Sequence, residues 1–374
     1  MVKTRGFGVE RQGETNVRWL NFSREEPKDT ELLVEILYCG LCHSDVEILA
    51  NNWGITKYPC VPGHEAVGRV VATGAKVLRY QVGAIIGVGC IIDSCMACPA
   101  CTEGWENHCE GPNGPTMTNG GYLTPGSEDG KAFNTLGAWA DNVVVREDFA
   151  IRIPKDVDLA QIAPLMCAGT DIFGPLRRFG ISPEKRIGVV GLGGPGECAL
   201  FYSQSVESSS WVGHLAVQIA KAMGAGHVTV FTTHPDKRDA ALRLGADEVT
   251  VSTDIAAMRK LSRSFHHILS TIPVPFEAAP YLALLRRRGS MTVMGLLGPY
   301  ATRLNNFDLA AAGLSLTGSM IGSVAETQES VDFCVKNKIL PEIELVEATP
   351  EKINQAIGRL KMADVRFRFV IKVK

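Results

Sequence analysis

The two halves of the chain differ in how their apolar positions are spaced. In the first half, short runs rich in valine, isoleucine and leucine are interrupted by glycine and proline. Such runs predict the strands of a mostly β domain, with examples at residues 32–37, 68–72 and 140–145. From about Ile162 onward, short apolar runs alternate with longer segments of helical spacing. That alternation predicts a doubly wound parallel sheet of the α/β class.

The same pattern places individual elements. In the second half it predicts strands at residues 187–190, 228–231 and 291–294, and helices at residues 214–223 and 237–244. Near the C-terminus it predicts a helix over residues 351–360, preceded by Pro350, and a strand over residues 367–373.

Composition narrows the class of protein. The chain has 374 residues and a formal net charge of −2, with both signs of charge mixed along it. We therefore expect neither nucleic acid nor a membrane surface as a partner. Residues 1–12 are polar, and no segment has the roughly 18 apolar residues of a membrane span, so we expect a cytoplasmic protein. In that reducing compartment, eleven cysteines favour metal sites over disulfides.

Four of the cysteines are clustered in the pattern C-x2-C-x2-C-x7-C, formed by Cys95, Cys98, Cys101 and Cys109. Four thiolates this close in sequence can complete a tetrahedral shell around Zn²⁺ and leave no position open for substrate. Chance clustering and a pair of disulfides are the alternatives, but a spacing of three residues suits neighbouring disulfides poorly. The pattern predicts a structural zinc site.

A second set of metal-binding side chains is dispersed along the chain. Cys42 lies in CGLCHSD, His64 in VPGHEAVG and Cys167 in PLMCAG. Two thiolates and one imidazole form the three-ligand shell of a catalytic zinc with an open fourth position. Each residue alone is more typical of a packed core, so the prediction depends on the three occurring together.

These motifs, with DSCMACPAC between the second and third, resemble the zinc-containing medium-chain alcohol dehydrogenases. Within that family the chain is most similar to the cinnamyl-alcohol-dehydrogenase-like branch, which includes NADP-dependent aldehyde reductases. The resemblance implies a GroES-like, mostly β catalytic domain built from residues 1–160 and 321–374. It also implies a Rossmann NADP-binding domain over residues 161–320, and a homodimer.

The resemblance also implies roles for single residues. Cys42, His64 and Cys167 would hold the catalytic zinc, with Glu65 beside it as a second-shell or exchanging ligand. Ser44 would hydrogen-bond the substrate oxygen and pass its proton outward, and His43 would lie near the cofactor pyrophosphate. Zinc in an open site polarises a carbonyl, and the nicotinamide carries the hydride. We therefore expect interconversion of primary alcohols and aldehydes, with aromatic or medium-chain substrates.

A glycine-rich turn follows the strand predicted at residues 187–190. The turn matches the pattern G-x-G-x-x-G and contains Gly191, Gly193, Gly194 and Gly196. Between a strand and a helix, this pattern is a fingerprint of dinucleotide binding. NAD enzymes usually carry an acidic residue at the end of the second strand. Thr232 and Thr233 stand there instead, followed by Lys237 and Arg238, which suits the 2′-phosphate of NADP(H). A solvated loop with incidental charges is the alternative.

The chain departs from the family in one long stretch. Seventeen residues, 197–213, separate GLGGPG from HLAVQIAKAMG, whereas relatives join the two directly. We hypothesise that this serine-rich stretch is a retained intron or gene-model error, which sequencing of transcripts would test. The alternative is a genuine surface insertion that leaves Gly196 or Gly213 in the phosphate turn.

Two smaller departures concern the proton route and the nicotinamide. Glu47 stands where this branch usually has a proton-relaying histidine, and Asp171 replaces the usual threonine after Thr170. Two alternative functions stay open: a specialised natural-product reductase, and a non-catalytic dinucleotide-binding relative disabled by the extra stretch. Trp53, Trp139 and Met117 are candidate pocket residues, although core packing explains them equally well.

Overall fold

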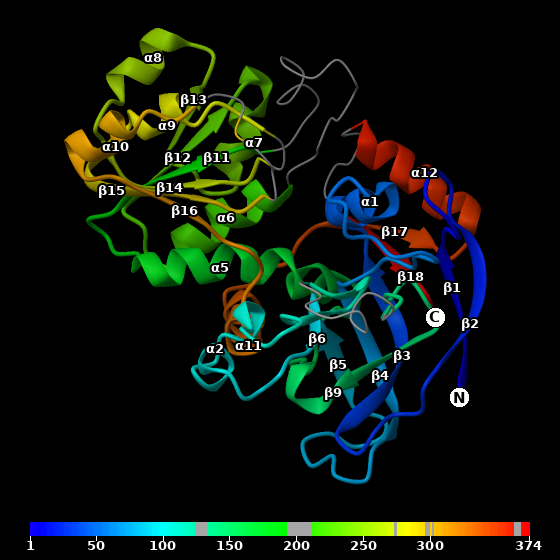
Figure 1. The fold of residues 1–374 in the computed structure, drawn as a ribbon. Helices are drawn as coiled ribbons and strands as arrows, with labels where there is room; N and C mark the ends of the chain where they lie inside the picture. The colour runs from blue at the N-terminus through cyan, green and yellow to red at the C-terminus, as the bar shows by residue number, and fades with distance from the viewer. Residues whose placement is uncertain (124–133, 193–210, 273–274, 296–299, 301–302, 363–367) are drawn as a thin grey trace. The chain divides into compact units, whose positions relative to one another are not determined.

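The chain divides into two units in the computed structural model (Figure 1), which describes residues 1–123, 134–192, 211–272, 275–295, 300, 303–362 and 368–374. The first unit contains Met1–Thr170, Ile321–Gly358 and Phe367–Lys374, so segments from both ends of the chain build it. The second contains Asp171–Met320 and Arg359–Arg366.

The first unit is mostly β. Its largest sheet has the order β10-β5-β4-β3-β18-β17, and β9 also pairs with β3. Most pairs in this sheet are antiparallel, but β17 and β18 are parallel. The strands of this sheet are β3 (Glu31–Gly40), β4 (Ala66–Thr73), β5 (Ile85–Val88), β9 (Asn142–Arg146), β10 (Ala150–Arg152), β17 (Ile343–Glu347) and β18 (Arg368–Lys372).

Smaller elements complete this unit. β1 (Val2–Gly8) pairs with β2 (Arg18–Arg24), and a small sheet joins β6 (Ile91–Asp93), β7 (Thr116–Met117) and β8 (Gly121–Tyr122). The helices are α1 (His43–Ala50), α2 (Pro99–Thr102), α4 (Leu159–Ile162), α11 (Val324–Lys336) and α12 (Pro350–Lys361, whose end lies in the second unit), with short 3₁₀ turns η1 (Glu106–His108), η2 (Glu147–Phe149) and η3 (Ala163–Met166).

The second unit contains a six-stranded parallel sheet in the order β13-β12-β11-β14-β15-β16. Counted along the chain this order is 3-2-1-4-5-6, which is the Rossmann arrangement. The predicted α/β class is confirmed. The strands are β11 (Arg186–Val190), β12 (His227–Thr232), β13 (Glu248–Val251), β14 (Phe265–Ser270), β15 (Leu285–Val293) and β16 (Ser315–Gly318).

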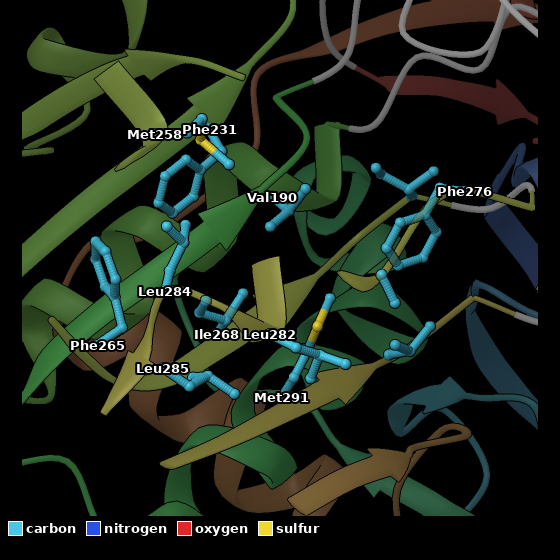
Figure 2. Close-up of a cluster of buried hydrophobic side chains, with 13 residues drawn as sticks. Val190, Phe231, Met258, Phe265, Ile268, Phe276, Leu282, Leu284, Leu285 and Met291 are labelled. Carbon is cyan, nitrogen blue, oxygen red and sulfur yellow. The ribbon is translucent and has the colours of Figure 1, made fainter. Parts of the chain in front are cut away.

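Helices pack around this sheet (Figure 1), and one face of it carries an apolar core (Figure 2). Phe231, Phe265 and Ile268 are fully buried there. Helices cover both faces of such a parallel sheet, so its strands carry apolar side chains on both faces. The helices are α5 (Ala168–Phe179, which begins in the first unit), α6 (Trp211–Ala222), α7 (Arg238–Arg243, preceded by η4, Pro235–Lys237), α8 (Ile255–Lys260), α9 (Ala279–Leu282) and α10 (Asn306–Ala312).

The structure refines one boundary that matters for the site. The helix expected over residues 214–223 begins at Trp211, so the last residues of the extra stretch 197–213 form its first turn. The rest of that stretch, up to residue 210, lies outside the described residues. None of the described helices has the length and apolar character needed to cross a membrane.

Candidate functional site

The expected zinc ligands form two separate groups in the first unit. In the first group the four sulfur atoms of Cys95, Cys98, Cys101 and Cys109 lie within 4.8 Å of one another. The Sγ atoms of Cys95 and Cys101 are 3.9 Å apart. A tetrahedron of sulfur atoms about 2.3 Å from Zn²⁺ has an edge of roughly 3.8 Å, so this sulfur set fits a zinc ion.

Backbone N–H groups support these sulfur atoms. Cys98 N lies 3.3 Å from Cys95 Sγ, and Glu110 N lies 3.3 Å from Cys98 Sγ. Such donors lower the pKa of the Cys95 thiol to about 6, with N–H groups of residues 97 and 98 as the main causes. Gly111 allows the chain to pass close to the cluster, since a Cβ there would lie 2.9 Å from Cys95 Cβ. Cys95 and Cys98 therefore favour thiolate, the form that binds zinc, whereas burial raises the pKa of Cys101 and Cys109.

The second group joins residues from three separate elements. Cys42 directly precedes α1, His64 precedes β4 and Cys167 lies between η3 and α5. One ligand atom from each of these residues, and one from Glu65, lie within 4.8 Å of one another. His64, Glu65 and Cys167 are buried, so a cation here would be shielded from most solvent.

The two thiols of this group interact directly. Their hydrogen bond holds the pKa of Cys42 well below its usual range and the pKa of Cys167 well above it. This hydrogen bond therefore favours the thiolate form at Cys42. A zinc ion would replace the shared proton and convert both residues to thiolate ligands.

Asp45 orients the imidazole ring of His64 through a hydrogen bond to Nδ1. Its Oδ1 accepts hydrogen bonds from His64 Nδ1 at 3.1 Å and from Gly63 N at 2.9 Å. Its Oδ2 accepts from Cys42 N at 2.8 Å. Burial opposes the charged imidazole, but the Asp45 carboxylate outweighs it and raises the pKa of His64 well above its ordinary value. With Nδ1 held as a donor, Nε2 is the nitrogen available to a metal.

Ser44 and Glu65 flank the ligand set. Ser44 Oγ lies 3.1 Å from His64 Nε2. Glu65 is fully buried and forms a two-pronged ion pair with Arg368 of β18, whose Nε donates to Glu65 Oε2 at 3.1 Å. Burial raises the pKa of Glu65, and the charge of Arg368 opposes that shift and favours the carboxylate.

Sequence reasoning missed Arg368 entirely, and it named Asp45 only as part of a motif. Arg368 carries no local motif, and its partner lies 303 residues earlier in the chain. The available signal was an arginine directly before three apolar residues of a strand, because a buried arginine needs a paired carboxylate.

His43 and Glu47 both lie on α1. His43 Nε2 is 3.1 Å from Glu47 Oε1. Asp171 is in the first turn of α5, directly after Thr170, whose buried hydroxyl has no hydrogen-bond partner among the described residues. Of the candidate pocket residues, Trp139 is fully buried and donates its indole N–H to Gly40 O, so packing accounts for it. Trp53 and Met117 are partly buried.

In the second unit, the glycine turn follows β11. Gly191 has a φ of 93°, a left-handed conformation that favours glycine. Gly213, in the first turn of α6, approaches Gly191 so closely that a Cβ on it would collide with the Gly191 carbonyl group. The described residues therefore bring Gly213 against the turn, while Gly193, Gly194 and Gly196 lie outside them.

The residues expected at the 2′-phosphate follow β12. Thr232 is buried, and its Oγ1 accepts a hydrogen bond from His234 N at 3.2 Å. Thr233 Oγ1 is buried without a hydrogen-bond partner among the described residues. Lys237 lies in η4, while Arg238 donates to Val249 O at 3.2 Å and so faces the neighbouring strand.

Two sequence families match the chain. Residues 28–155 match the alcohol dehydrogenase GroES-like domain, and residues 212–336 match the zinc-binding dehydrogenase family. The aldehyde reductase YahK of Escherichia coli K12 is 41% identical over 354 residues, which cover 94% of this chain and 93% of that protein.

The chain is also similar to solved structures of cinnamyl alcohol dehydrogenases. A cinnamyl alcohol dehydrogenase of Sorghum bicolor superimposes with a TM-score of 0.87 at 35% identity, covering 99% of this chain and 98% of that one. A cinnamyl alcohol dehydrogenase of Helicobacter pylori, solved with NADP(H), has a TM-score of 0.84 at 32% identity and the same coverage.

Proposed function

The chain belongs to the zinc-binding alcohol dehydrogenases with a GroES-like domain, and from this premise we propose that it interconverts aldehydes and primary alcohols with NADP(H). The observation that carries the proposal is the convergence of Cys42, His64 and Cys167, with Glu65, within 4.8 Å. Two thiolates and one imidazole leave a fourth position for a substrate oxygen. The completeness of this set favours an enzyme over a non-catalytic relative.

The residues present fit two zinc ions per chain, one in each group. Cys42, His64 and Cys167 would hold the catalytic ion, and Cys95, Cys98, Cys101 and Cys109 the structural one. When bound, the catalytic zinc supplies a Lewis acid that polarises the substrate oxygen, and NADPH supplies the hydride. The thiolate-favouring environment of Cys42 and Cys95 supports both assignments.

Ser44 is the proposed proton carrier. Its hydroxyl lies 3.1 Å from His64 Nε2, the nitrogen assigned to the metal, and so it is next to the open position. Ser44 Oγ would hold the proton that an aldehyde gains or an alcohol loses. Glu65, fixed by Arg368, would lie behind the ligands as a second-shell or exchanging group.

We assign the cofactor to the turn between β11 and α6. Gly213 brings the start of α6 against the Gly191 turn, and the N-terminus of this helix would favour the charge of a dinucleotide phosphate. The Thr233 hydroxyl, which has no partner within the described part of the chain, would receive the 2′-phosphate together with Thr232 and Lys237. Gly193, Gly194 and Gly196 remain proposed members of the same turn.

We propose aromatic or medium-chain aldehydes as substrates, a homodimer as the assembly and the cytoplasm as the location. Strand β16 supports the homodimer proposal. It lies at the end of the six-stranded sheet and pairs with β15 alone among the described strands. Its other edge could therefore pair with a strand of a second chain. The cytoplasmic proposal is supported by the described cysteines, none of which forms a disulfide with another.

The test is NADPH oxidation with a panel of aromatic and medium-chain aldehydes, with NADH in parallel. The intact chain is compared with a version lacking residues 197–213. Activity in both supports the proposal and makes the extra stretch a tolerated loop. Activity only in the shortened chain supports the chemistry and identifies the stretch as a retained intron or gene-model error. Absence of activity in both, with zinc bound, overturns the proposal.

A further inference from the structure

Arg24, the last residue of β2, directs a partly buried guanidinium group at two backbone carbonyls. Its Nη1 donates to Thr135 O at 2.7 Å, and its Nη2 donates to Gly137 O at 2.9 Å. Its Nε is buried and has no hydrogen-bond partner in the described part of the chain. Burial lowers the pKa of Arg24, and no described carboxylate opposes that shift. A charge withdrawn from water without an opposing charge is costly, so fold stability explains this arginine poorly.

The two carbonyls belong to a segment, residues 135–139, that lies directly against residues 61–63. Three consecutive backbone N–H groups, those of residues 137–139, donate to the carbonyl oxygens of residues 61–63 at 2.6–2.9 Å. Gly137 leaves no room for a side chain in this contact, because a Cβ on it would collide with the carbonyl groups of Pro62 and Gly63. The backbone positions of the two segments are therefore tied together.

Residues 61–63 lead directly into His64. Gly63 has a left-handed φ of 102°, and a Cβ on it would lie 2.5 Å from Trp139 N. Its N–H donates to Asp45 Oδ1 at 2.9 Å, and the same oxygen accepts from His64 Nδ1 at 3.1 Å. Gly63 therefore lies between the 135–139 segment and the carboxylate that orients the imidazole. A shift of this segment would move both the backbone that carries His64 and the partner of its ring.

A second connection runs from the same segment to Glu65. Trp139 is fully buried, and its indole N–H donates to Gly40 O at 3.2 Å. Gly40 N in turn donates to Glu65 O at 2.8 Å. The 135–139 segment is thus linked to the backbone of two consecutive residues of the candidate metal centre, and Arg24 holds the segment where it begins.

We propose that Arg24 is a positioning residue for the candidate metal centre, which fixes the 135–139 segment and through it the backbone that carries His64. A planar guanidinium can hold two carbonyls in fixed directions, whereas a lysine ammonium is a single point charge. Arg24, the segment and the metal-binding residues all lie in the first unit. The inference rests on the proposed function, since it takes Cys42, His64 and Cys167 as a zinc site. Arg24 offers no ligand to the metal and acts through backbone contacts.

Zinc binding to the full chain tests the proposal. The zinc-loaded protein is titrated with a chromophoric chelator, and His64→Ala identifies which release step belongs to this site. We expect Arg24→Met to weaken zinc binding there about tenfold, an effect typical of residues that orient metal ligands without touching the metal. Zinc in the four-cysteine group should stay bound. Arg24→Lys keeps the charge but not the planar fork, so its loss of affinity should be smaller, about threefold.

Asn354→Ala is the matched control. Asn354 of α12 also makes two side-chain hydrogen bonds to the backbone of the first unit, accepting from Val17 N at 2.8 Å and donating to Val17 O at 2.9 Å. Its substitution removes the same number of contacts but leaves the 135–139 segment with Arg24. We expect Asn354→Ala to lower the free energy of unfolding while zinc affinity stays at the wild-type value.

Cobalt substitution separates positioning from a general loss of stability. The visible absorption bands of Co²⁺ report the geometry of its ligands, and the difference from the His64→Ala spectrum isolates the bands of this site. We expect Arg24→Met to change the position or intensity of these bands and Arg24→Lys to change them less. Asn354→Ala should give the wild-type spectrum.

Wild-type zinc affinity or wild-type cobalt bands in folded Arg24→Met would overturn the inference. Equal losses in Asn354→Ala would also overturn it, because they would trace the effect to stability alone. If Arg24→Met does not fold, the Arg24→Lys spectrum decides: altered bands support the inference, and wild-type bands overturn it. A wild-type chain that binds no zinc through Cys42, His64 and Cys167 would instead refute the proposed function.

Discussion

Asp45 Oδ1 accepts the Nδ1 proton of His64 at 3.1 Å while its second oxygen holds the backbone N–H of Cys42 at 2.8 Å. One buried carboxylate thus fixes two of the proposed zinc ligands. Metal affinity and ligand geometry should therefore depend on a residue that does not touch the metal.

Asp45→Asn removes this charge but keeps the shape. We expect zinc affinity to fall by about 10- to 100-fold, because His64 loses the adjacent negative charge and an NH2 donor replaces the oxygen that accepts from Cys42 N. Competition with a chromophoric chelator measures the change. Asp156→Asn is the matched control, since Asp156 is exposed and asparagine tolerates its left-handed backbone, with φ of 59°. Equal zinc affinity in the two variants would contradict the role given to Asp45.

Arg368→Met leaves the Glu65 carboxylate buried and unpaired. Removing one partner of a buried ion pair costs about 3–5 kcal/mol, and chemical denaturation should detect a loss of that size. The double variant Glu65→Gln, Arg368→Met removes the stranded charge and should recover part of the loss. If the single variant is as stable as wild type, the ion pair does not stabilise the fold.

Cys98→Ser tests the four-cysteine group. We expect bound zinc to fall from about two ions per chain to about one, because three thiolates bind a structural zinc far more weakly than four. Hydrogen exchange should increase over residues 91–122, where β6, α2, β7 and β8 surround the cluster. The chain should keep its second zinc, as measured by atomic emission. Loss of both ions would mean that the two sites are not independent.

Gly213→Ala tests the close approach between α6 and the turn after β11. A Cβ on residue 213 would collide with the Gly191 carbonyl group, so the helix start must move. We expect NADPH affinity to fall at least about tenfold, since the phosphate turn depends on this packing. Gly358→Ala is the matched control, because it lies in α12 with open space around its Cα and should be neutral or slightly stabilising.

His267 gives the second unit a defined sensitivity to acid. Burial lowers the pKa of this histidine to about 4, and its ring is stacked on Phe179. In the unfolded chain His267 takes up a proton near the ordinary histidine pKa of 6.5. The contribution of His267 to the free energy of unfolding is therefore largest above pH 6.5 and falls as the pH drops toward 4. The loss attributable to His267 should reach about 3 kcal/mol. Between pH 7 and 4 the free energy of unfolding should fall more steeply for wild type than for His267→Gln. Parallel curves would contradict this.

Much of the candidate site could be predicted because its signals are local in sequence. The four-cysteine spacing is complete within residues 95–109, and the turn after β11 directly follows a strand of unmistakable pattern. Helix α6 was expected to begin at residue 214, but it begins at Trp211, because the extra stretch carries no periodic pattern from which a boundary could be read. Its final residues nevertheless supply the glycine that meets Gly191.

Arg368 could not be predicted because its role depends on strand pairing. Antiparallel pairing of β18 with β3 aligns Val370 with Gly40 and Ile371 with Cys39, and this register places Arg368 beside Glu65. A shift of one residue would turn its side chain to the other face of the sheet. Local patterns identify a strand there but do not fix its neighbour or its register.

The 303 residues between Glu65 and Arg368 also set an order of events during synthesis. At about 5–20 residues per second, Glu65 emerges roughly 15–60 seconds before its partner is made. Throughout that interval the nascent first unit lacks β18, and the carboxylate next to His64 has no guanidinium to neutralise it. The metal centre is therefore among the last parts of the protein to mature, and a ribosome stalled before residue 368 holds a chain with every expected zinc ligand but no finished site.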